Sequence, residues 1–409
     1  MAKISDRGIN MPLSPIRKLS PLAAKAKKEG KFVHQLNIGQ PDIPTPEWAI
    51  NDLKSTDFKV VEYSPSEGEL SLREAFVEYY KKYDIEVTTD EMIITYGASE
   101  ALMIVLLSCL NPWDEVIVPE PFYANYSSFA GAADITVKPI SSSIESNFAL
   151  PSIDEFEKLI GPRTKAILIC SPNNPTGYTY SKDELEKLKK ICLKYDLFLI
   201  SDEVYREFYY HGEFAPSILG LKGVEDKTIM LDSASKRYSM CGVRVGAIVS
   251  KNKEVIQTAL KFGQARLSPP QFGQVAVESA LKASDTYYRE VKEEYKKRKD
   301  VLIEELSKIE GVKYSHPYGA FYTVVELPID DDEKFCSWIL TDFDFEGETV
   351  MFAPGSGFYV TPGAGKREIR IAYVVEEEKL RRAMKCLREA LKVYPGRISE
   401  QLPENATSI

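Results

Sequence analysis

The sequence predicts an α/β protein in which a large domain, built on a mostly parallel sheet flanked by helices, carries a smaller α+β domain. Three observations lead to this prediction. The chain has 409 residues, which is too long for one ordinary hydrophobic core. From Glu91 to Ala247, short apolar and β-branched runs alternate with amphipathic segments, as in a parallel sheet covered by helices. After Gly311, strand-like and helical runs are mixed, which is typical of an α+β unit.

The chain begins with a polar stretch, Met1 to Asn10, without the basic start, apolar run and cleavage site of a secretory signal. The longest apolar run, Ala101 to Leu110, is shorter than the ~20 residues of a membrane-spanning helix, so we expect a buried helix there. A net charge of −9 argues against nucleic acid and anionic membranes as partners. We therefore expect a cytoplasmic protein. The spacing of its three histidines and six cysteines indicates neither a metal site nor a disulfide framework.

We expect three parts along the chain. Residues 1–46 would form an N-terminal arm and part of the small domain, and residues 47–284 the large domain. Residues 285–409 would form a connecting helix and the C-terminal small domain. The charged run from Asp285 to Ile309 predicts that helix. In the small domain we expect strands over Phe321–Leu327 and Glu368–Val374 and a helix over Glu376–Leu391.

Six strands are expected in the large domain, and polar residues gather just past their ends. In an open α/β sheet, ligands bind outside the carboxyl ends of the strands, so the chemistry is expected there. The six predicted strands are Met92–Thr95, Val116–Pro119, Lys165–Cys170, Leu197–Ser201, Thr228–Asp232 and Gly246–Val249.

The segment Ser233-Ala-Ser235-Lys236 follows the strand that ends at Asp232, and Arg244 lies between two glycines shortly after it. Hydroxyls and an arginine suit a phosphate-bearing ligand. A lysine amine that is crowded by positive charge and partly removed from water has a lowered pKa and becomes nucleophilic. The pattern favours Schiff-base chemistry at Lys236, although both cations could also lie on the surface beside a glycine turn.

Two further segments could bind a cofactor. Asn174 lies in a Pro-stiffened turn after one predicted strand, and Asp202 and Tyr205 follow the next strand. A partly buried carboxylate can hold a proton on a heterocyclic nitrogen. Ala98 and Ser99 begin a helix whose free backbone N–H groups could bind an anion. Each segment alone is equally compatible with an ordinary turn or helix cap.

Together these segments resemble fold type I pyridoxal phosphate (PLP) enzymes, specifically the class I and II aminotransferases, from about Leu36 to about Leu391. The clearest match is S-x-S-K-x5-G-x-R-x-G, which runs from Ser233 to Gly246 in register with N-P-T-G, D-x-x-Y and G-A-S upstream. The resemblance implies that PLP is bound covalently to Lys236 as a Schiff base. It also implies that Lys236 moves the proton between the substrate Cα and the cofactor.

The resemblance implies roles for the other residues as well. Asp202 would keep the pyridine nitrogen protonated, Asn174 and Tyr205 would hydrogen-bond the cofactor's O3′, and Tyr123 would stack on the ring. A homodimer with shared active sites is implied, because Tyr63 matches a tyrosine that reaches the phosphate of the neighbouring subunit. The other residues around the phosphate would be Ala98, Ser99, Ser233, Ser235 and Arg244.

For the substrate, Arg370 resembles the arginine that grips the α-carboxylate with its bidentate fork. Asn174 would share that site, and Gly39 resembles the segment that closes over it. Some aspartate-using relatives place a lysine directly after the G-A-S motif, where this chain has Glu100. Arg266 could instead bind the distal carboxylate of aspartate or glutamate, or it could form a structural salt bridge.

We expect an aminotransferase that works by a ping-pong mechanism on an L-amino acid, aspartate, and a 2-oxo acid, 2-oxoglutarate. Alanine or aromatic amino acids are alternative substrates. A PLP-dependent C–S lyase is an alternative reaction, because related scaffolds use nearly the same cofactor residues. A non-catalytic ligand-sensing domain is disfavoured, since the short segment before the family match contains no helix-turn-helix pattern.

Overall fold

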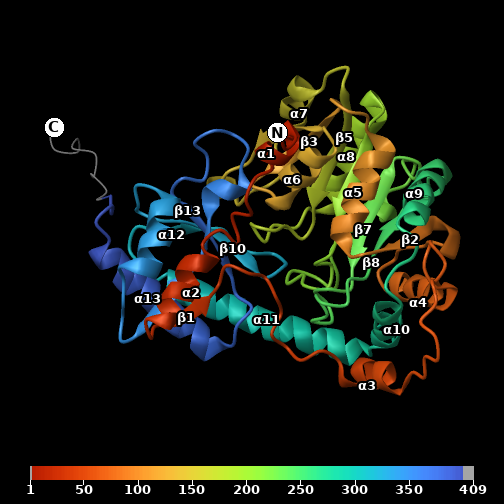
Figure 1. The fold of residues 1–409 in the computed structure, drawn as a ribbon. Coiled ribbons are helices and arrows are strands. Elements are labelled where there is room, and N and C mark those ends of the chain that lie inside the picture. The colour runs from red at the N-terminus through yellow and green to blue at the C-terminus, as the bar shows by residue number, and fades with distance from the viewer. Residues whose placement is uncertain (1, 399–409) are drawn as a thin grey trace.

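The computed structural model describes residues 2–398. Its largest sheet has the strand order β2-β8-β7-β6-β5-β3-β4 (Figure 1). Within the described residues, β8 alone in this sheet runs antiparallel to its neighbours, so the sheet is mostly parallel as predicted. The strands are β2 Met92–Thr95, β3 Glu115–Glu120, β4 Thr136–Ser141, β5 Thr164–Cys170, β6 Phe198–Asp202, β7 Thr228–Ser233 and β8 Gly246–Val249.

All six strands predicted for the large domain are present, and their ends differ from the predicted ends by no more than one residue. The sequence reading missed β4. This strand lies at the edge of the sheet, contains Lys138 and Pro139, and has one buried residue, Ile140. Proline is tolerated at a sheet edge, but it interrupts the apolar pattern by which strands are found.

Helices cover both faces of the sheet (Figure 1). Helices α5 (Ala98–Cys109), α6 (Asn125–Ala132) and α9 (Lys253–Ala265) lie on one face, and α7 (Ile153–Leu159) and α8 (Lys182–Tyr195) lie on the other. Strand β5 shows how both faces are filled: Leu168 packs in the core on the α5 side, whereas Ile167 and Ile169 pack on the α8 side. Burial on both faces explains why the strands read as nearly continuous apolar runs.

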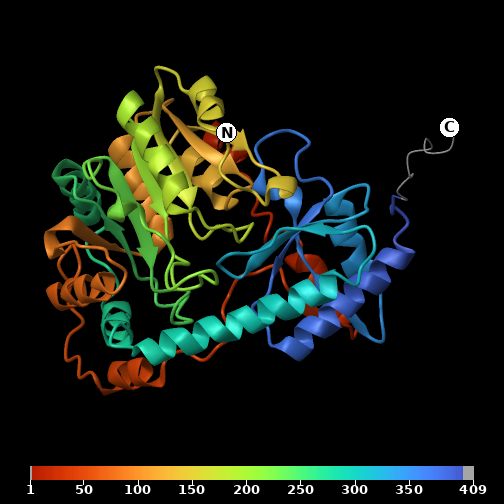
Figure 2. The same ribbon diagram turned by 180° about the vertical axis from the view of Figure 1, so that it is seen from behind.

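A second, smaller group of elements contains the antiparallel sheet β12-β13-β10-β9 and the parallel pair β1-β11. Helix α11 (Asp285–Leu306) runs as one rod from the region of α3 (Glu47–Ser55) and α10 (Gln271–Ala280) to α13 (Glu377–Val393) (Figure 1 and Figure 2). The strands here are β1 Phe32–Gln35, β9 Lys313–Tyr314, β10 Tyr322–Glu326, β11 Glu348–Met351, β12 Ala353–Pro354 and β13 Glu368–Ala372. We keep residues 1–46, 47–284 and 285–409 as proposed domain limits.

The remaining helices complete the two groups. Helices α1 and α2 belong to the N-terminal segment, α3, α4 and α10 pack near β2 and β8, and α12 and α13 cover the smaller sheets (Figure 1). Among the described helices, none is both long and apolar enough to cross a membrane. Their bounds are α1 Asp6–Asn10, α2 Ser20–Lys28, α3 Glu47–Ser55, α4 Leu70–Lys81, α10 Gln271–Ala280, α12 Asp332–Thr341 and α13 Glu377–Val393.

Candidate active site

A cavity of about 480 Å³ lies at the carboxyl ends of strands β5, β6 and β7. It is lined by the last residue of each strand: Cys170, Asp202 and Ser233. This is the edge at which an open α/β sheet binds ligands. The cavity brings together most of the residues singled out in the sequence. They are Gly39, Ala98, Ser99, Tyr123, Asn174, Asp202, Tyr205, Ser233, Ser235, Lys236, Arg244 and Arg370.

Asp202 lines this cavity and is buried, with 7% of the residue exposed. Burial raises its pKa to about 6, while the hydroxyl of Tyr126, which donates to Oδ2 at 2.8 Å, opposes the rise. Tyr126 was not identified from the sequence. Its signal was its position one helical turn after Tyr123, at the start of α6.

The amine of Lys236 donates a hydrogen bond to the carbonyl oxygen of Gly39 at 2.8 Å. Burial is the main cause that lowers its pKa, the nearby thiol of Cys241 opposes this, and the positive charge of Arg370 adds to the lowering. A lowered pKa increases the neutral, nucleophilic fraction of the amine. Lys236 is therefore suited to forming a covalent bond with a carbonyl group.

The N-terminus of α5 and a set of hydroxyls form an anion-binding corner of the cavity. Ser99 lies in the first turn of α5, and Ser233 Oγ donates to Ser235 Oγ at 2.8 Å. Arg244 donates to the carbonyl oxygens of Cys241 and Tyr96, both at 3.0 Å. Free N–H groups at a helix start, hydroxyls and a guanidinium are the donors that bind phosphate.

Gly97, directly before α5, allows this corner to form. Its backbone has φ +78° and ψ 176°, a conformation that is essentially restricted to glycine. A Cβ atom at Gly97 would also lie 2.6 Å from Nη2 of Arg244. A side chain at this position would therefore strain the backbone and displace the guanidinium.

Arg370, from β13, is 1% exposed and also lines the cavity. Its Nη1 donates to Oδ1 of Asn174 at 2.9 Å, and its Nη2 donates to the carbonyl oxygen of Asn37. Its guanidinium also lies 4.6 Å from the ring centre of Tyr322, whose hydroxyl is 2.9 Å from that of Tyr205. No acceptor among the described residues meets its Nε, so a buried cation retains a donor for an anionic ligand.

Two residues singled out in the sequence do not line the cavity. The side chain of Tyr63 is 78% exposed. Arg266 donates from Nη2 to the carbonyl oxygens of Ser66, at 2.9 Å, and Ile94, at 3.0 Å. Its Nε lies 3.9 Å from Oε1 of Glu100. These contacts correspond to the structural salt bridge that the sequence left open for Arg266.

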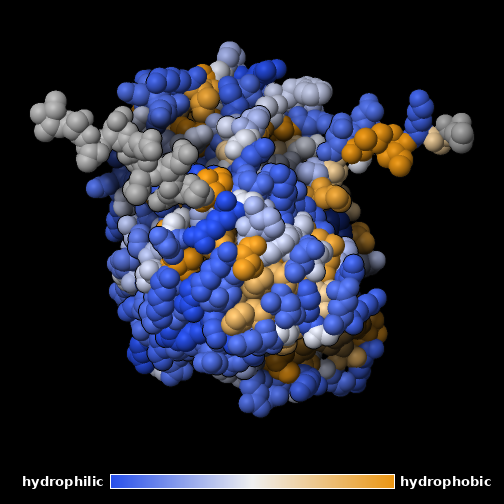
Figure 3. Space-filling view, turned by 90° about the vertical axis from the view of Figure 1, so that its left-hand side faces the viewer, coloured by the Kyte–Doolittle hydropathy of each residue, from blue (hydrophilic) through white to orange (hydrophobic). Residues whose placement is uncertain are grey.

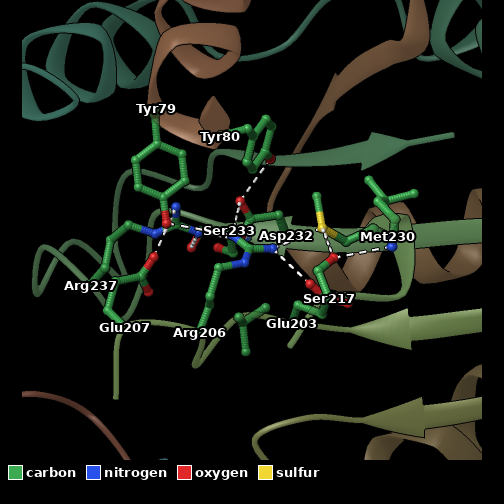
Figure 4. Close-up of polar contacts among 12 residues, drawn as sticks. Tyr79, Tyr80, Glu203, Arg206, Glu207, Ser217, Met230, Asp232, Ser233 and Arg237 are labelled. Carbon is green, nitrogen blue, oxygen red and sulfur yellow. Dashed lines mark hydrogen bonds and ion pairs between the residues drawn. The ribbon is translucent and has the colours of Figure 1, made fainter. Parts of the chain in front are cut away.

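Behind the cavity lies a buried charge cluster that the sequence reading did not identify (Figure 4). Its ion pairs join buried carboxylates to buried arginines that come from the strand ends and the loops after them. It consists of Glu203, Arg206, Glu207, Asp232 and Arg237. Four of these residues are sequence neighbours of cavity residues: Glu203 of Asp202, Arg206 of Tyr205, Asp232 of Ser233 and Arg237 of Lys236.

The contacts of this cluster fix the loop that carries Lys236. Arg237 pairs with Asp232, and its Nη2 donates to the carbonyl oxygen of Ser233 at 3.1 Å. The hydroxyl of Tyr80 donates to Oδ2 of Asp232 at 2.7 Å (Figure 4). Since the partners are buried, removing one of them would leave an uncompensated charge away from water. The cluster thus holds the backbone on which the cavity residues stand.

Known proteins resemble the chain over nearly its full length. The family profile "aminotransferase class I and II" matches residues 33–387. An aspartate aminotransferase of Thermotoga maritima is 35% identical over 382 residues, 92% of this chain and 97% of the relative. A structure of Thermus thermophilus aspartate aminotransferase with maleate has a TM-score of 0.85 at 30% identity, covering 96% of this chain and 100% of that one. An alanine aminotransferase structure from Pyrococcus furiosus has a TM-score of 0.87 at 30% identity, covering 95% and 100%.

Proposed function

The chain belongs to the class I and II aminotransferase family, and on this premise we propose that it transfers an amino group between L-aspartate and 2-oxoglutarate with PLP bound to Lys236. The family is PLP-dependent, and the chain is an aminotransferase. The observation that carries the proposal is the cavity in which Lys236, Asp202 and Arg370 meet. It combines a nucleophilic amine, a buried carboxylate and a buried cation with a free donor.

The residues of the cavity fit PLP. The phosphate would take the start of α5 with Ser99, Ser233, Ser235 and Arg244, since these donors suit a dianion. The buried carboxylate of Asp202, which lines the same cavity, suits a protonated heterocyclic nitrogen. When bound, PLP supplies an electron sink for the negative charge that develops at the substrate Cα.

The chain's own residues would then act as follows. Lys236 would hold the cofactor covalently and carry the proton at the substrate Cα, a role favoured by its lowered pKa. Asp202 would hold a proton on the ring nitrogen. Burial raises the pKa of Tyr205, so its hydroxyl remains a hydrogen-bond donor and, with Asn174, would serve the cofactor's O3′. Arg370 would orient the substrate through its α-carboxylate.

Tyr123 completes the proposed cofactor site. It lines the cavity, and Nδ2 of Asn125 donates to its hydroxyl at 2.9 Å, which orients the phenol ring. This position supports the proposal that the ring packs against the pyridine of the cofactor. Gly39, whose carbonyl oxygen accepts from Lys236, would lie beside the substrate carboxylate.

Aspartate is proposed as the donor because the Thermotoga relative is named for it and the Thermus structure contains maleate, a dicarboxylate. The Pyrococcus structure is an alanine aminotransferase, so alanine is the alternative that an assay must exclude. Arg266 is not included in the proposed substrate site, because it does not line the cavity and its Nη2 is held by two backbone carbonyl oxygens.

We also propose a homodimer with shared active sites, in which Tyr63 reaches the phosphate corner of the second copy. The exposed phenol of Tyr63 supports this arrangement. An N-terminal arm, residues 2–13, projects from the body and bears hydrophobic side chains (Figure 3). Three of these, Ile4, Ile9 and Leu13, are 75%, 67% and 82% exposed, which favours burial against another copy. Sedimentation of the purified protein as a monomer would contradict this part of the proposal.

The proposed function is tested by visible absorbance of the purified protein with excess PLP, followed by L-aspartate, L-alanine and L-tyrosine in turn. We expect an absorbance band of covalently bound cofactor that the Lys236→Ala variant lacks. Aspartate should convert it to the aminated cofactor and release a 2-oxo acid. No band in PLP-saturated protein would refute the cofactor role of Lys236. Release of ammonia and an oxo acid without amination of the cofactor would instead indicate a lyase.

A further inference from the structure

The segment from Ser14 to Arg17, in the N-terminal part of the chain, lines the cavity. Ser14, Ile16 and Arg17 are among its lining residues. The segment is held in place on its other side: Nδ2 of Asn37 donates to the carbonyl oxygen of Ile16 at 2.8 Å. Pro15 packs so closely on Gly357 that a Cβ there would lie 2.2 Å from the proline Cβ. The backbone at residue 17 is therefore fixed relative to the cavity.

Arg17 differs from its neighbour Lys18 in how its charge is used. Lys18 forms an ion pair with Glu333, away from the cavity. No residue of the described range 2–398 forms an ion pair or a side-chain hydrogen bond with Arg17. Burial raises the pKa of the Tyr123 phenol, and the nearby positive charge of Arg17 opposes this rise. Arg17 therefore lies near Tyr123. Its guanidinium is thus available at the side of the cavity where Tyr123 and Asn125 lie.

The proposed function assigns a ligand group to every charged residue of the cavity lining except Arg17. Among the described lining residues the cations are Arg17, Lys236, Arg244 and Arg370, and the one carboxylate is Asp202. In the proposed function, Arg244 serves the phosphate, Arg370 the α-carboxylate and Lys236 the carbonyl carbon, while Asp202 faces the ring nitrogen. One positive charge remains, that of Arg17, which is exposed at the cavity and could pair with one further negative charge on the ligand.

We infer that Arg17 binds the side-chain carboxylate of a dicarboxylic substrate while Arg370 binds the α-carboxylate. This inference rests on the proposed function and adds the residue that selects the substrate. Arginine suits the task, since its planar fork matches a carboxylate and it stays charged at every physiological pH. Because the donor amino acid and the acceptor 2-oxo acid would both be dicarboxylic, one cation serves both half-reactions.

The inference is tested on the PLP-loaded enzyme with the variants Arg17→Met and Arg17→Lys and, as a matched control, Lys18→Met. The readouts are kcat/KM for L-aspartate and for L-alanine, and calorimetric titration with maleate and with propionate. In Arg17→Met we expect kcat/KM for aspartate and affinity for maleate to fall ~10- to 100-fold, as for loss of one charged hydrogen-bonding partner. The kcat/KM for alanine and the affinity for propionate should change less than about threefold. Arg17→Lys should show a smaller loss than Arg17→Met, because lysine keeps the charge but not the planar fork.

The outcomes separate this inference from the function on which it rests. Equal losses for aspartate and alanine in Arg17→Met would indicate a structural role for the segment and overturn the inference. Wild-type enzyme that uses aspartate, with an unchanged aspartate-to-alanine ratio in Arg17→Met, would overturn the inference alone. Wild-type enzyme that transaminates alanine or tyrosine but not aspartate would overturn the substrate choice and the role of Arg17 together. A comparable loss in Lys18→Met would show that any cation of the segment acts at long range, against a specific contact.

Discussion

Replacing Asp202 by asparagine should stabilise the cofactor-free protein while removing its function. The folded protein holds this carboxylate in a buried site, where its pKa rises from 3.8 to about 6. A raised carboxyl pKa means that the folded state binds the proton more tightly than the unfolded state, so stability is lost as pH rises through this window. The cost is about 1 kcal/mol at pH 4.5 and reaches about 3 kcal/mol at pH 8. Asparagine avoids this cost and still accepts from Tyr126.

The assay is urea denaturation of the PLP-free protein and its Asp202→Asn variant at pH 8 and pH 4.5. We expect the variant to gain about 1–3 kcal/mol in the free energy of unfolding at pH 8 and at most about 1 kcal/mol at pH 4.5. Asp196→Asn, at an exposed carboxylate, is the control and should gain nothing comparable. Excess PLP should stabilise the wild type more than the variant. A variant that is equally stable or less stable than the wild type at pH 8 would refute the reasoning about the buried charge.

Three other substitutions test the structure around the cavity. Arg237→Met leaves buried carboxylates without a partner and should lower the free energy of unfolding, measured by urea denaturation, by about 3–5 kcal/mol. The control Arg7→Met, at an exposed ion pair, should lower it by less than about 1 kcal/mol. Similar losses in the two variants would contradict the structural role of the cluster. Gly97→Ala should weaken PLP binding at least ~10-fold and cost about 1–3 kcal/mol, because a Cβ meets Arg244 and the backbone is strained; unchanged fluorescence titrations would argue against this. Tyr126→Phe removes the hydrogen bond that opposes the rise in the pKa of Asp202 to about 6, so this pKa should rise further. Since PLP binding would need the ionised carboxylate, the pH below which PLP affinity falls should move upward. An unchanged midpoint of that pH dependence would exclude a contribution of Tyr126.

The sequence predicted every strand of the large sheet except β4, because those six strands are buried and end in polar turns. The same physics located most of the site, since Asn174, Asp202 and Lys236 each follow a strand that could be identified, and parallel strands end at one edge. Strand β4 escaped because it lies at the edge and is only partly buried.

The residues that sequence reasoning missed are those defined by tertiary contact. Arg17 lies far from every motif in the sequence and reaches the cavity only after the N-terminal segment folds onto Asn37 and Gly357. One member of the buried charge cluster could have been predicted from the alternation of side chains along a strand. Neighbouring residues of a strand face opposite sides, so, if Ser233 faces the cavity, Asp232 must face away from it. Nothing local indicated that Arg237 would be its partner.

The interleaving of cavity residues with buried charges has a consequence for how the protein can tolerate change in length. One backbone carries both sets in its loops, so deleting one residue between β7 and Lys236 would move Arg237 to the position of Lys236. The cavity would then lose its amine, and Asp232 would lose its buried partner. Point substitutions in these loops can therefore be graded in effect, whereas a change of register abolishes the packing and the site in the same event.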